Sequence, residues 1–535
     1  MLHLKKIYKL FFLSLFAFSC TNVIDDKKNV IIILADDLGY SDLGCFGSEI
    51  NTPNIDKLAS EGTIFTNFYS SPLCAPSRAM LLSGNDNHIA GIGIQAYKSD
   101  DFGYEGVLSD RVAIIPELLQ KNGYKTFMSG KWHIGGDPIN RGFHKTFALI
   151  PGAFAHYDNN KPIKGYPDSA FSENGKRKLW TEGKYSSDYY TDKMIEFIDS
   201  SNGDPFFGYL SYTAPHWPLQ VSKNFSDKYK GYYDGGYEKI KLERFNNLKL
   251  KSFIPEDLKY PKFENSYRKW NELNDSEKKV ESRKMEIYAG MIDNLDYNVG
   301  RLIKYLKDSD QFDKTVIIFM SDNGAAGEDF YYNDTYGPYI QEKFSYDYDL
   351  MGTSKSFVSI GKAWAEVITF PFKLYKGFTT SGGMRSPLII SGLPEKKYSS
   401  TDQFITLLDI APSIYNILNI NYSEKLNNKK IHKLLGESIL PYLSGEKENI
   451  HGDGYIFSFE HSGNSVLFKN NWKIVNKTSP FNTNNFELYH MSDISETYDM
   501  KKKNSKIFSE MLYDWENYTL EKKLIFPTPY VDNLN

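Results

Sequence analysis

The sequence predicts an α/β fold: a large, mixed but mostly parallel sheet sandwiched by helices, followed by a smaller C-terminal domain with an antiparallel sheet and a helix. Two observations carry this prediction. Short apolar runs rich in β-branched residues alternate with helical patterns over the first 420 residues. Near residue 421 the chain becomes polar and rich in Asn and Lys, and shorter strand patterns follow. A chain of 535 residues suits one large domain and one small domain.

Four apolar runs are the predicted strands of the large sheet, at residues 29–35, 124–130, 205–210 and 315–321. Continuous apolar runs of this length are typical of strands buried on both faces, as in a parallel sheet with helical layers. Each run leads into polar residues, which are Asp36 and Asp37, Lys131 and His133, His216, and Asp322 and Asn323. Ligands of open α/β sheets bind at the carboxyl ends of the strands, so these side chains are expected at one edge.

Helical patterns lie between the strands. Thr52 and Pro53 begin one helix, which Gly62 ends, and residues 116–122 form another, which Gly123 ends. The longest pattern covers residues 276–307 and carries a single apolar stripe. In the C-terminal domain, strands are expected at residues 454–459, 465–468 and 472–475, with a final helix near 504–518.

The N-terminus has the pattern of a targeting segment. Three lysines precede a short apolar stretch at residues 10–18, which is too short to span a bilayer. Residues 17–20 loosely match a lipoprotein cleavage site that would leave a lipid on Cys20, and residues 21–28 would be a tether. The alternative is cleavage of an ordinary signal peptide near the same place. We therefore expect residues 1–20 to direct export to the periplasm or cell surface, with a lipid anchor in the outer membrane as the only membrane attachment.

Charge and cysteine content narrow the class of protein. The net charge of −4 is spread without long runs, which argues against a nucleic-acid partner. Only three cysteines occur, at positions 20, 45 and 74. Cys45 and Cys74 could form a disulfide, but Cys45 lies in a turn-like Gly-Cys-Phe-Gly segment and is expected to be structural.

The acidic pairs at two strand ends predict a metal site. Asp36 with Asp37, and Asp322 with Asn323, offer carboxylate and amide oxygens, which suit calcium or magnesium. Buried carboxylates without a partner would be costly, and a hard cation removes that cost. The alternative for each pair is a helix cap or a turn.

Cys74 begins a predicted helix that Gly84 ends. A helix N-terminus and the nearby Arg78 both favour an anion at this position. The alternative is a buried structural cysteine.

The residues around Cys74 resemble a family signature. Cys-x-Pro-Ser-Arg at 74–78, followed by Ala-x-Leu-Leu-Ser-Gly at 79–84, is similar to the signature of type I, formylglycine-dependent sulfatases in the alkaline phosphatase superfamily. Further motifs of that family occur in its order, at residues 36–40, 130–133, 214–220, 321–324 and 374–377. The resemblance is greatest to bacterial arylsulfatases and covers residues 29–420, the predicted catalytic domain, leaving 421–535 as the C-terminal domain.

The resemblance implies a role for each site residue. A maturation enzyme would oxidise Cys74 to formylglycine, and Asp36, Asp37, Asp322, Asn323 and the modified residue 74 would hold one Ca²⁺, with Mg²⁺ less favoured. Arg78 and Lys131 would stabilise the formylglycine diol and the sulfate, and Asp322 would help to deprotonate the attacking hydroxyl. His216 and Lys376 would bind sulfate and assist the leaving alcohol. His133 would accept a proton when sulfate is expelled. Taken singly, each His could be an ordinary buried residue and each Lys a surface residue.

The implied activity is hydrolysis of sulfate esters of aryl compounds or carbohydrates. One rival is a formylglycine-dependent phosphonate or phosphodiester hydrolase, which would place His where this chain has Asn323. A second is a non-catalytic glycan-binding lipoprotein, and a third is a zinc phosphatase, which would need more His ligands.

A segment rich in aromatic residues follows the second acidic pair. Residues 327–348 contain eight Tyr and Phe side chains and no clear helical or strand period, which predicts a loop. We expect this loop to border the subsite for the leaving group, because tyrosine faces suit stacking on a sugar or aryl ring. The alternative is that the rings only pack the loop onto the protein.

Overall fold

A computed structural model describes residues 27–157, 170–180, 183–264, 267–393 and 397–526. The predicted signal peptide, Cys20 and most of the predicted tether lie outside the described residues. Within the described ranges, no helix has both the length and the apolar character needed to cross a membrane.

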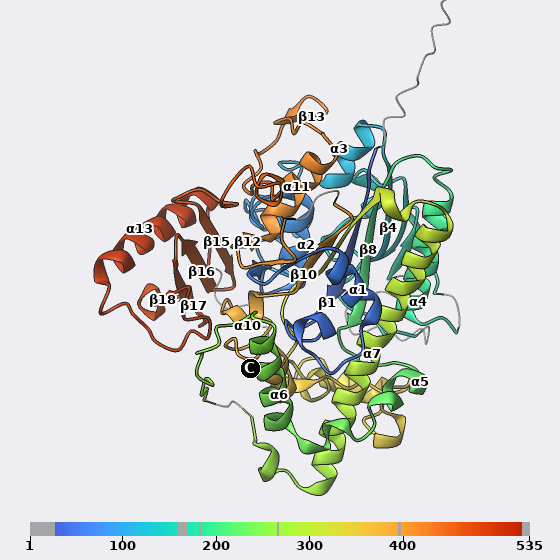
Figure 1. Ribbon diagram of the computed structural model, residues 1–535, viewed down its shortest axis with the longest axis vertical. Helices are drawn as coiled ribbons and strands as arrows, with labels where there is room; N and C mark the ends of the chain where they lie inside the picture. Colours follow the sequence, from blue (N-terminus) through green and yellow to red (C-terminus); the bar gives the residue numbers. More distant parts are fainter. Residues whose placement is uncertain (1–26, 158–169, 181–182, 265–266, 394–396, 527–535) are drawn as a thin grey trace, which may run out of the picture.

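A ten-stranded mixed sheet forms the centre of the large domain (Figure 1). Five neighbouring strands in its middle run parallel, and antiparallel strands extend it on both sides. In spatial order the strands are β11 (Ser400–Thr401), β2 (Thr63–Phe65), β10 (Leu388–Ser391), β9 (Thr315–Ser321), β1 (Asn29–Asp36), β8 (Phe206–Pro215), β4 (Lys125–Lys131), β5 (Lys145–Leu149), β6 (Phe171–Glu173) and β7 (Lys176–Lys178). The predicted fold class and the four predicted strands are confirmed.

The central strand β1 is buried on both faces, as its continuous apolar sequence predicts. Ile31 and Ile33 belong to one hydrophobic core, whereas Val30 and Ile32 point to the opposite core. The first core includes residues of α1 (Pro53–Glu61), α4 (Ser186–Asp199), α6 (Tyr237–Leu250), α7 (Asp275–Asp308) and α9 (Gly361–Thr369). The second includes residues of α2 (Cys74–Ser83), α3 (Ile115–Lys121) and α11 (Ile410–Ile417).

The helices begin and end close to the predicted positions. Gly62 follows the last residue of α1, and α3 begins one residue before the predicted start. The longest helix, α7, has 34 residues and starts with a capping box in which the Asn274 side chain accepts the Glu277 N–H and the Glu277 side chain accepts the Asn274 N–H. The shorter elements are α5 (Lys223–Ser226), α8 (Gly337–Lys343), α10 (Ser381–Met384), α12 (Leu440–Leu443), β3 (Phe68–Tyr69), β12 (Ile405–Thr406), β13 (Lys425–Leu426) and β14 (Lys429–Lys430).

The aromatic segment 327–348 differs from its prediction as a loop. It contains α8, which begins at Gly337 with Pro338 in its first turn. Ile340 and Phe344 of this segment are buried with Phe357 in a small cluster of their own. The alternative expectation, that the rings pack the segment onto the protein, is therefore correct for Phe344, whereas Tyr332 remains exposed.

The C-terminal residues form a four-stranded antiparallel sheet with one helix beside the large domain (Figure 1). Its elements are β15 (Ile456–His461), β16 (Asn464–Lys469), β17 (Trp472–Asn476), β18 (Glu487–His490) and α13 (Ser505–Lys522). One face, with Phe457 and Phe468, joins the core of the large domain, and the other face, with Leu467 and Ile474, packs against α13. The sheet thus lies between the large domain and its own helix.

Buried polar contacts also fix the C-terminal sheet on the large domain. His88 Nε2 lies 3.1 Å from Glu460 Oε2 of β15, and Tyr518 of α13 donates to Asp86 at 2.8 Å. Burial alone would lower the pKa of His88, but its contacts with Asp86 and Glu460 outweigh this and raise the pKa to about 9. His88 is thus a charged contact between the large domain and the C-terminal sheet.

Candidate active site

The site begins at the carboxyl ends of two neighbouring strands, β1 and β9. Asp36 is the last residue of β1, and Asp37 follows with φ of 65°. Ser321 ends β9 and joins both turns, because its Oγ accepts the Leu38 N–H at 3.0 Å and donates to the Asn323 carbonyl at 2.9 Å. Positive φ is uncommon for residues other than glycine, although aspartate adopts it more readily than most, and it is often found at functional sites.

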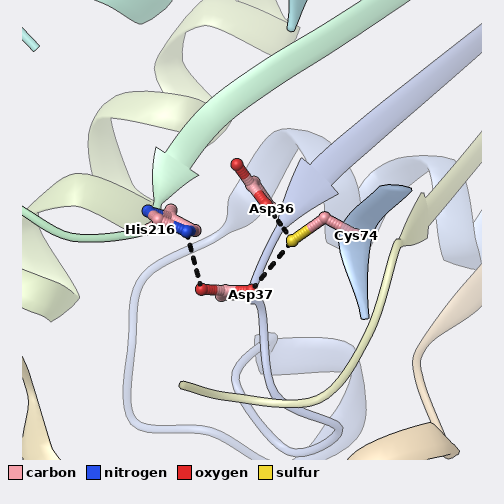
Figure 2. A group of neighbouring side chains, drawn as sticks. All are labelled: Asp36, Asp37, Cys74 and His216. Carbon is pink, nitrogen blue, oxygen red and sulfur yellow. Dashed lines mark hydrogen bonds and ion pairs between the residues drawn. The ribbon is translucent and has the colours of Figure 1, made fainter. Parts of the chain in front are cut away.

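Four side chains from three strand and helix ends meet at this point: Asp36, Asp37, Cys74 and His216 (Figure 2). Their potential ligand atoms all lie within 4.8 Å of one another. The Cys74 Sγ is 3.4 Å from Asp36 Oδ1 and 3.8 Å from Asp37 Oδ1. The cysteine of the signature therefore points directly at the acidic pair.

Helix α2 places Cys74 and Arg78 on one side. Cys74 is its first residue, and Gly84 ends it in the left-handed conformation with φ of 61°. One turn further, Arg78 Nη2 donates to Asp322 Oδ2 at 2.7 Å, and its Nη1 donates to the Lys131 carbonyl at 2.8 Å. The helix N-terminus and a fully buried guanidinium thus both favour negative charge beside residue 74.

Three cations balance three buried carboxylates. Lys131 Nζ donates to Asp36 Oδ2 at 2.7 Å, and Lys376 Nζ donates to Asp37 Oδ2 at 2.9 Å. Arg78 pairs with Asp322, as described above. Burial of so many charges is tolerable only because each one has an opposite charge within contact distance.

The donors fit a divalent cation. Asn323 Nδ2 donates to Asp37 Oδ1 at 2.6 Å, while its Oδ1 is buried and has no hydrogen-bond partner among the described residues. His216 Nδ1 donates to the Trp217 carbonyl at 2.7 Å, so the neutral ring directs the lone pair of Nε2 toward Asp37 Oδ2, 3.5 Å away. Two facing acceptors and an orphaned amide oxygen are what a cation would satisfy.

The arrangement adds one feature to the predicted all-oxygen site. His216 belongs to the potential ligand group, whereas Asp322 lies outside it. Asp322 Oδ2 pairs with Arg78, and its Oδ1 accepts the Asp37 N–H at 3.3 Å. Asp36, Asp37 and Asn323 offer the oxygens that a calcium ion would need, with Asp322 directly behind them.

His133 follows β4 with φ of 66°, and its ring lies against Gly152. A Cβ on Gly152 would lie 2.3 Å from the His133 Nε2, so only glycine leaves room for the ring. Burial first, and then the charges of Lys131, Arg78 and Lys376, hold the pKa of His133 well below its usual range. A neutral His133 can accept a proton, and its Nδ1 has no hydrogen-bond partner in the described part of the chain.

The cysteine itself is a poor nucleophile here. Burial, and then the charge of Asp322, raise the pKa of the Cys74 thiol well above its usual value. Burial and the charge of Asp36 likewise raise the pKa of Asp322. Both the burial and the neighbouring carboxylates thus disfavour the thiolate form of Cys74.

The structure brings the sequence-predicted site residues together, and it adds others. Ser211 of β8 accepts a hydrogen bond from Arg78 Nη1, and Gln95 accepts the Ala75 N–H at 3.1 Å. Ser211 directly follows the predicted strand at residues 205–210, whereas no local pattern marks Gln95. His156 is structural, because its Nε2 donates to the His216 carbonyl at 2.9 Å. Cys45 and Cys74 are both free thiols, so the disulfide alternative is wrong.

Comparisons with known proteins agree with this geometry. The sulfatase family model matches residues 28–420. The chain belongs to the sulfatase family. This sulfatase is 37% identical to an uncharacterised sulfatase of Schizosaccharomyces pombe over 93% of this chain and 94% of the relative. It is 34% identical to the arylsulfatase of Klebsiella aerogenes over 77% of this chain and 91% of the relative.

Among solved structures, the sulfatase is similar to Ps i-CgsB in complex with k-i-k-neocarrahexaose. The two are 25% identical with a TM-score of 0.66, over 94% of this chain and 95% of the other. The family, the metal-binding cluster and these relatives together support a sulfuric ester hydrolase that acts on a sulfated substrate.

Proposed function

We propose that this sulfatase hydrolyses carbohydrate or aryl sulfate esters with a formylglycine made from Cys74 and with one bound Ca²⁺. The observation that carries the proposal is the position of Cys74, whose Sγ faces Asp36 and Asp37 at the N-terminus of α2. The cysteine stands for the hydrated aldehyde, whose hydroxyl would attack sulfur. A calcium ion held by Asp36, Asp37 and Asn323 would lower the pKa of that hydroxyl and neutralise sulfate charge.

The cations of the site would hold the sulfate. Lys131 pairs with Asp36 and Lys376 with Asp37, and Arg78 Nη2 lies 3.6 Å from Asp36 Oδ1. His216 lies within reach of the same group, so it is placed to assist the leaving alcohol. His133 is neutral and would accept the proton from residue 74 when sulfate is expelled, which restores the aldehyde.

A peptide mass spectrum tests the modification. We expect residue 74 in active protein from its native host to be lighter than cysteine by about 18 Da, the difference for formylglycine. Active protein with an unmodified thiol at this position would contradict the proposal. A protein that carries formylglycine but hydrolyses a phosphonate monoester faster than 4-nitrophenyl sulfate would favour the rival phosphonate hydrolase, although Asn323 argues against it.

The natural substrate and location belong to the same proposal. A sulfated glycan fragment is the favoured substrate, because the similar Ps i-CgsB structure is a complex with k-i-k-neocarrahexaose. Export with a lipid on Cys20 would place the enzyme where such glycans occur. Labelling with a fatty acid in the native host, with Cys20→Ala as the control, tests the anchor: label that persists in the variant would contradict it.

A further inference from the structure

A cavity of about 650 Å³ lies between the first half of α7, the segment 327–333 and the start of α9. Its lining includes Tyr237 of α6, Lys284 of α7, and Phe330, Tyr332 and Tyr346 of the aromatic segment. We call it the tyrosine cavity. The catalytic site described above does not use it, and none of the potential metal ligands lines it.

The cavity shares a wall with the active site. Its lining residues Gly327–Phe330 follow Asn323 by only a few positions, and the charge of Glu328 acts on Lys376. The Phe330 ring lies 4.4 Å from that of Trp217, which follows His216. The segment 327–330 thus lines the cavity and also borders the catalytic groups.

Helix α7 gives a second measure of this proximity. Lys284 lines the cavity, and Tyr288, four residues later, donates to the Asp37 carbonyl at 3.3 Å. Residues four apart lie on the same face of a helix, about 6 Å apart along the axis. Helix α7 therefore contacts both the cavity and the acidic pair, through residues one helical turn apart.

The lining combines flat rings with polar groups at their edges. The rings of Tyr332 and Tyr346 are 5.3 Å apart, and the Tyr237 hydroxyl donates to Glu281 at 3.0 Å. Tyr332 is 63% exposed, so its ring is held at the rim without being part of a core. Exposed tyrosine faces beside carboxylates and amides suit a sugar ring, which has an apolar face and peripheral hydroxyls.

The charges of the cavity nearly cancel. Among the described lining residues, four are acidic and three are basic. The buried ammonium of Lys284 is already paired with Glu281 at 2.7 Å. No surplus of positive charge is available for a second sulfate group, so the cavity fits a neutral sugar unit.

We propose that the tyrosine cavity binds a neutral sugar unit of a sulfated glycan, next to the unit whose sulfate is removed. This inference rests on the proposed function, because it places the rest of the substrate beside the same active site. It predicts that the enzyme prefers oligosaccharides to monosaccharide sulfates, and that the preference depends on exposed rings such as Tyr332.

The experiment uses the mature full-length enzyme, Tyr332→Ala, and Tyr513→Ala as the matched control. Tyr513 is 64% exposed on α13, outside the cavity. The probes are 4-nitrophenyl sulfate and sulfated hexasaccharides of carrageenan, chondroitin, heparin and fucan type, each compared with its monosaccharide sulfate. For the preferred hexasaccharide, Tyr332→Ala should lower kcat/KM about three- to tenfold relative to the aryl sulfate. The inhibition constant of the desulfated hexasaccharide should rise by a similar factor, and Tyr513→Ala should change neither.

Each outcome decides one proposal. If formylglycine-containing enzyme hydrolyses no sulfate ester at all, the proposed function fails. If it hydrolyses 4-nitrophenyl sulfate but prefers no hexasaccharide to its monosaccharide, or if Tyr332→Ala affects aryl sulfate and oligosaccharide equally, only the cavity proposal is overturned. Tighter binding when a second sulfate is added to the neighbouring sugar unit would overturn the neutral assignment.

Discussion

Two buried clusters of carboxylates, each with a buried arginine, lie close together in this sulfatase. The first is the active site, where Asp36, Asp37 and Asp322 face Arg78 and two lysines. The second, which we call the Arg244 cluster, consists of Asp42, Glu49, Arg244, Tyr233 and Tyr288. Arg244 donates to Asp42 at 2.7 Å and to both oxygens of Glu49 at 2.8 and 2.9 Å.

The clusters differ in how completely their acceptors are satisfied. In the Arg244 cluster, Tyr288 donates to Asp42 at 2.6 Å and Tyr233 donates to Glu49 at 2.7 Å, so both carboxylates are enclosed by donors. In the active site, the Asn323 Oδ1 has no partner among the described residues, and His216 Nε2 faces Asp37 acceptor to acceptor. A closed set of hydrogen bonds indicates a structural cluster, and acceptors left over indicate a site for a ligand.

The largest expected effect is the loss of activity when the nucleophile of the active site is removed. Cys74→Ala should lower kcat/KM for 4-nitrophenyl sulfate at least about 10³-fold, because the nucleophile is removed. The urea concentration at the midpoint of unfolding should change little. Cys45→Ala is the matched control and should keep wild-type turnover. A Cys74→Ala enzyme that keeps more than a tenth of wild-type kcat/KM would show that Cys74 is not the source of the nucleophile.

Removal of the metal should have the second-largest effect on activity. Chelation should lower turnover about 10²-fold or more, and calcium should restore it, because the leftover acceptors would then lose their cation. Calcium should also raise Tm in proportion to the logarithm of its concentration above Kd, since it binds only the folded state. Elemental analysis that finds stoichiometric zinc without calcium or magnesium would contradict this assignment.

The Arg244 cluster should respond in stability instead of chemistry. Arg244→Met would leave Asp42 and Glu49 buried without their cation, which should lower the free energy of unfolding by about 3–5 kcal/mol. The kcat of the folded fraction should stay within about twofold of wild type, since no acceptor of the active site is touched. The control, Arg177→Met, changes an exposed arginine of β7 and should alter neither quantity. If the Arg244→Met enzyme were stable but had a low kcat, the Arg244 cluster would serve catalysis and not stability.

His88 allows a test, through the pH dependence of stability, of a buried charged contact that is structural and lies at the domain interface. Its pKa is raised to about 9 by Asp86 and Glu460 against the opposing effect of burial, so charging it stabilises the folded state. This contribution is fully present below pH of about 6.5 and is lost as pH rises through about 9, amounting to roughly 3 kcal/mol. Urea midpoints between pH 6 and 9.5 should fall for the wild type and stay flatter for His88→Gln. Parallel curves would show that His88 is not charged in the folded protein.

Tyr288→Phe should have the smallest effect and is the sharpest test. The hydroxyl of Tyr288 touches both clusters, through Asp42 and through the Asp37 carbonyl. Its removal should lower the free energy of unfolding by about 1 kcal/mol, because Arg244 and the Gly39 N–H still satisfy Asp42. A loss of kcat larger than about fivefold would mean that the Arg244 cluster positions the active site.

Local sequence patterns mark most of the residues that the structure brings together around Cys74, whereas no pattern marks the Arg244 cluster. The site residues stand at the ends of apolar runs or inside a contiguous signature, so local patterns mark them. Glu49 and Arg244 lie 195 positions apart with no such pattern, and only the fold brings them together. Helix α8 was missed because dense aromatic residues hid its period, although Gly337-Pro338 offered a start signal.

The burial of Cys74 has a consequence for how the enzyme is made. Cys74 is only 1% exposed, and its Sγ faces Asp36 and Asp37 at the end of β1. A maturation enzyme cannot reach a thiol enclosed in this way, and burial also keeps that thiol protonated and unreactive. If Cys74 is oxidised to formylglycine as proposed, the oxidation has to precede closure of the domain, so folding and maturation would compete in time. Protein that folds before it is modified would be stable, metal-binding and permanently inactive.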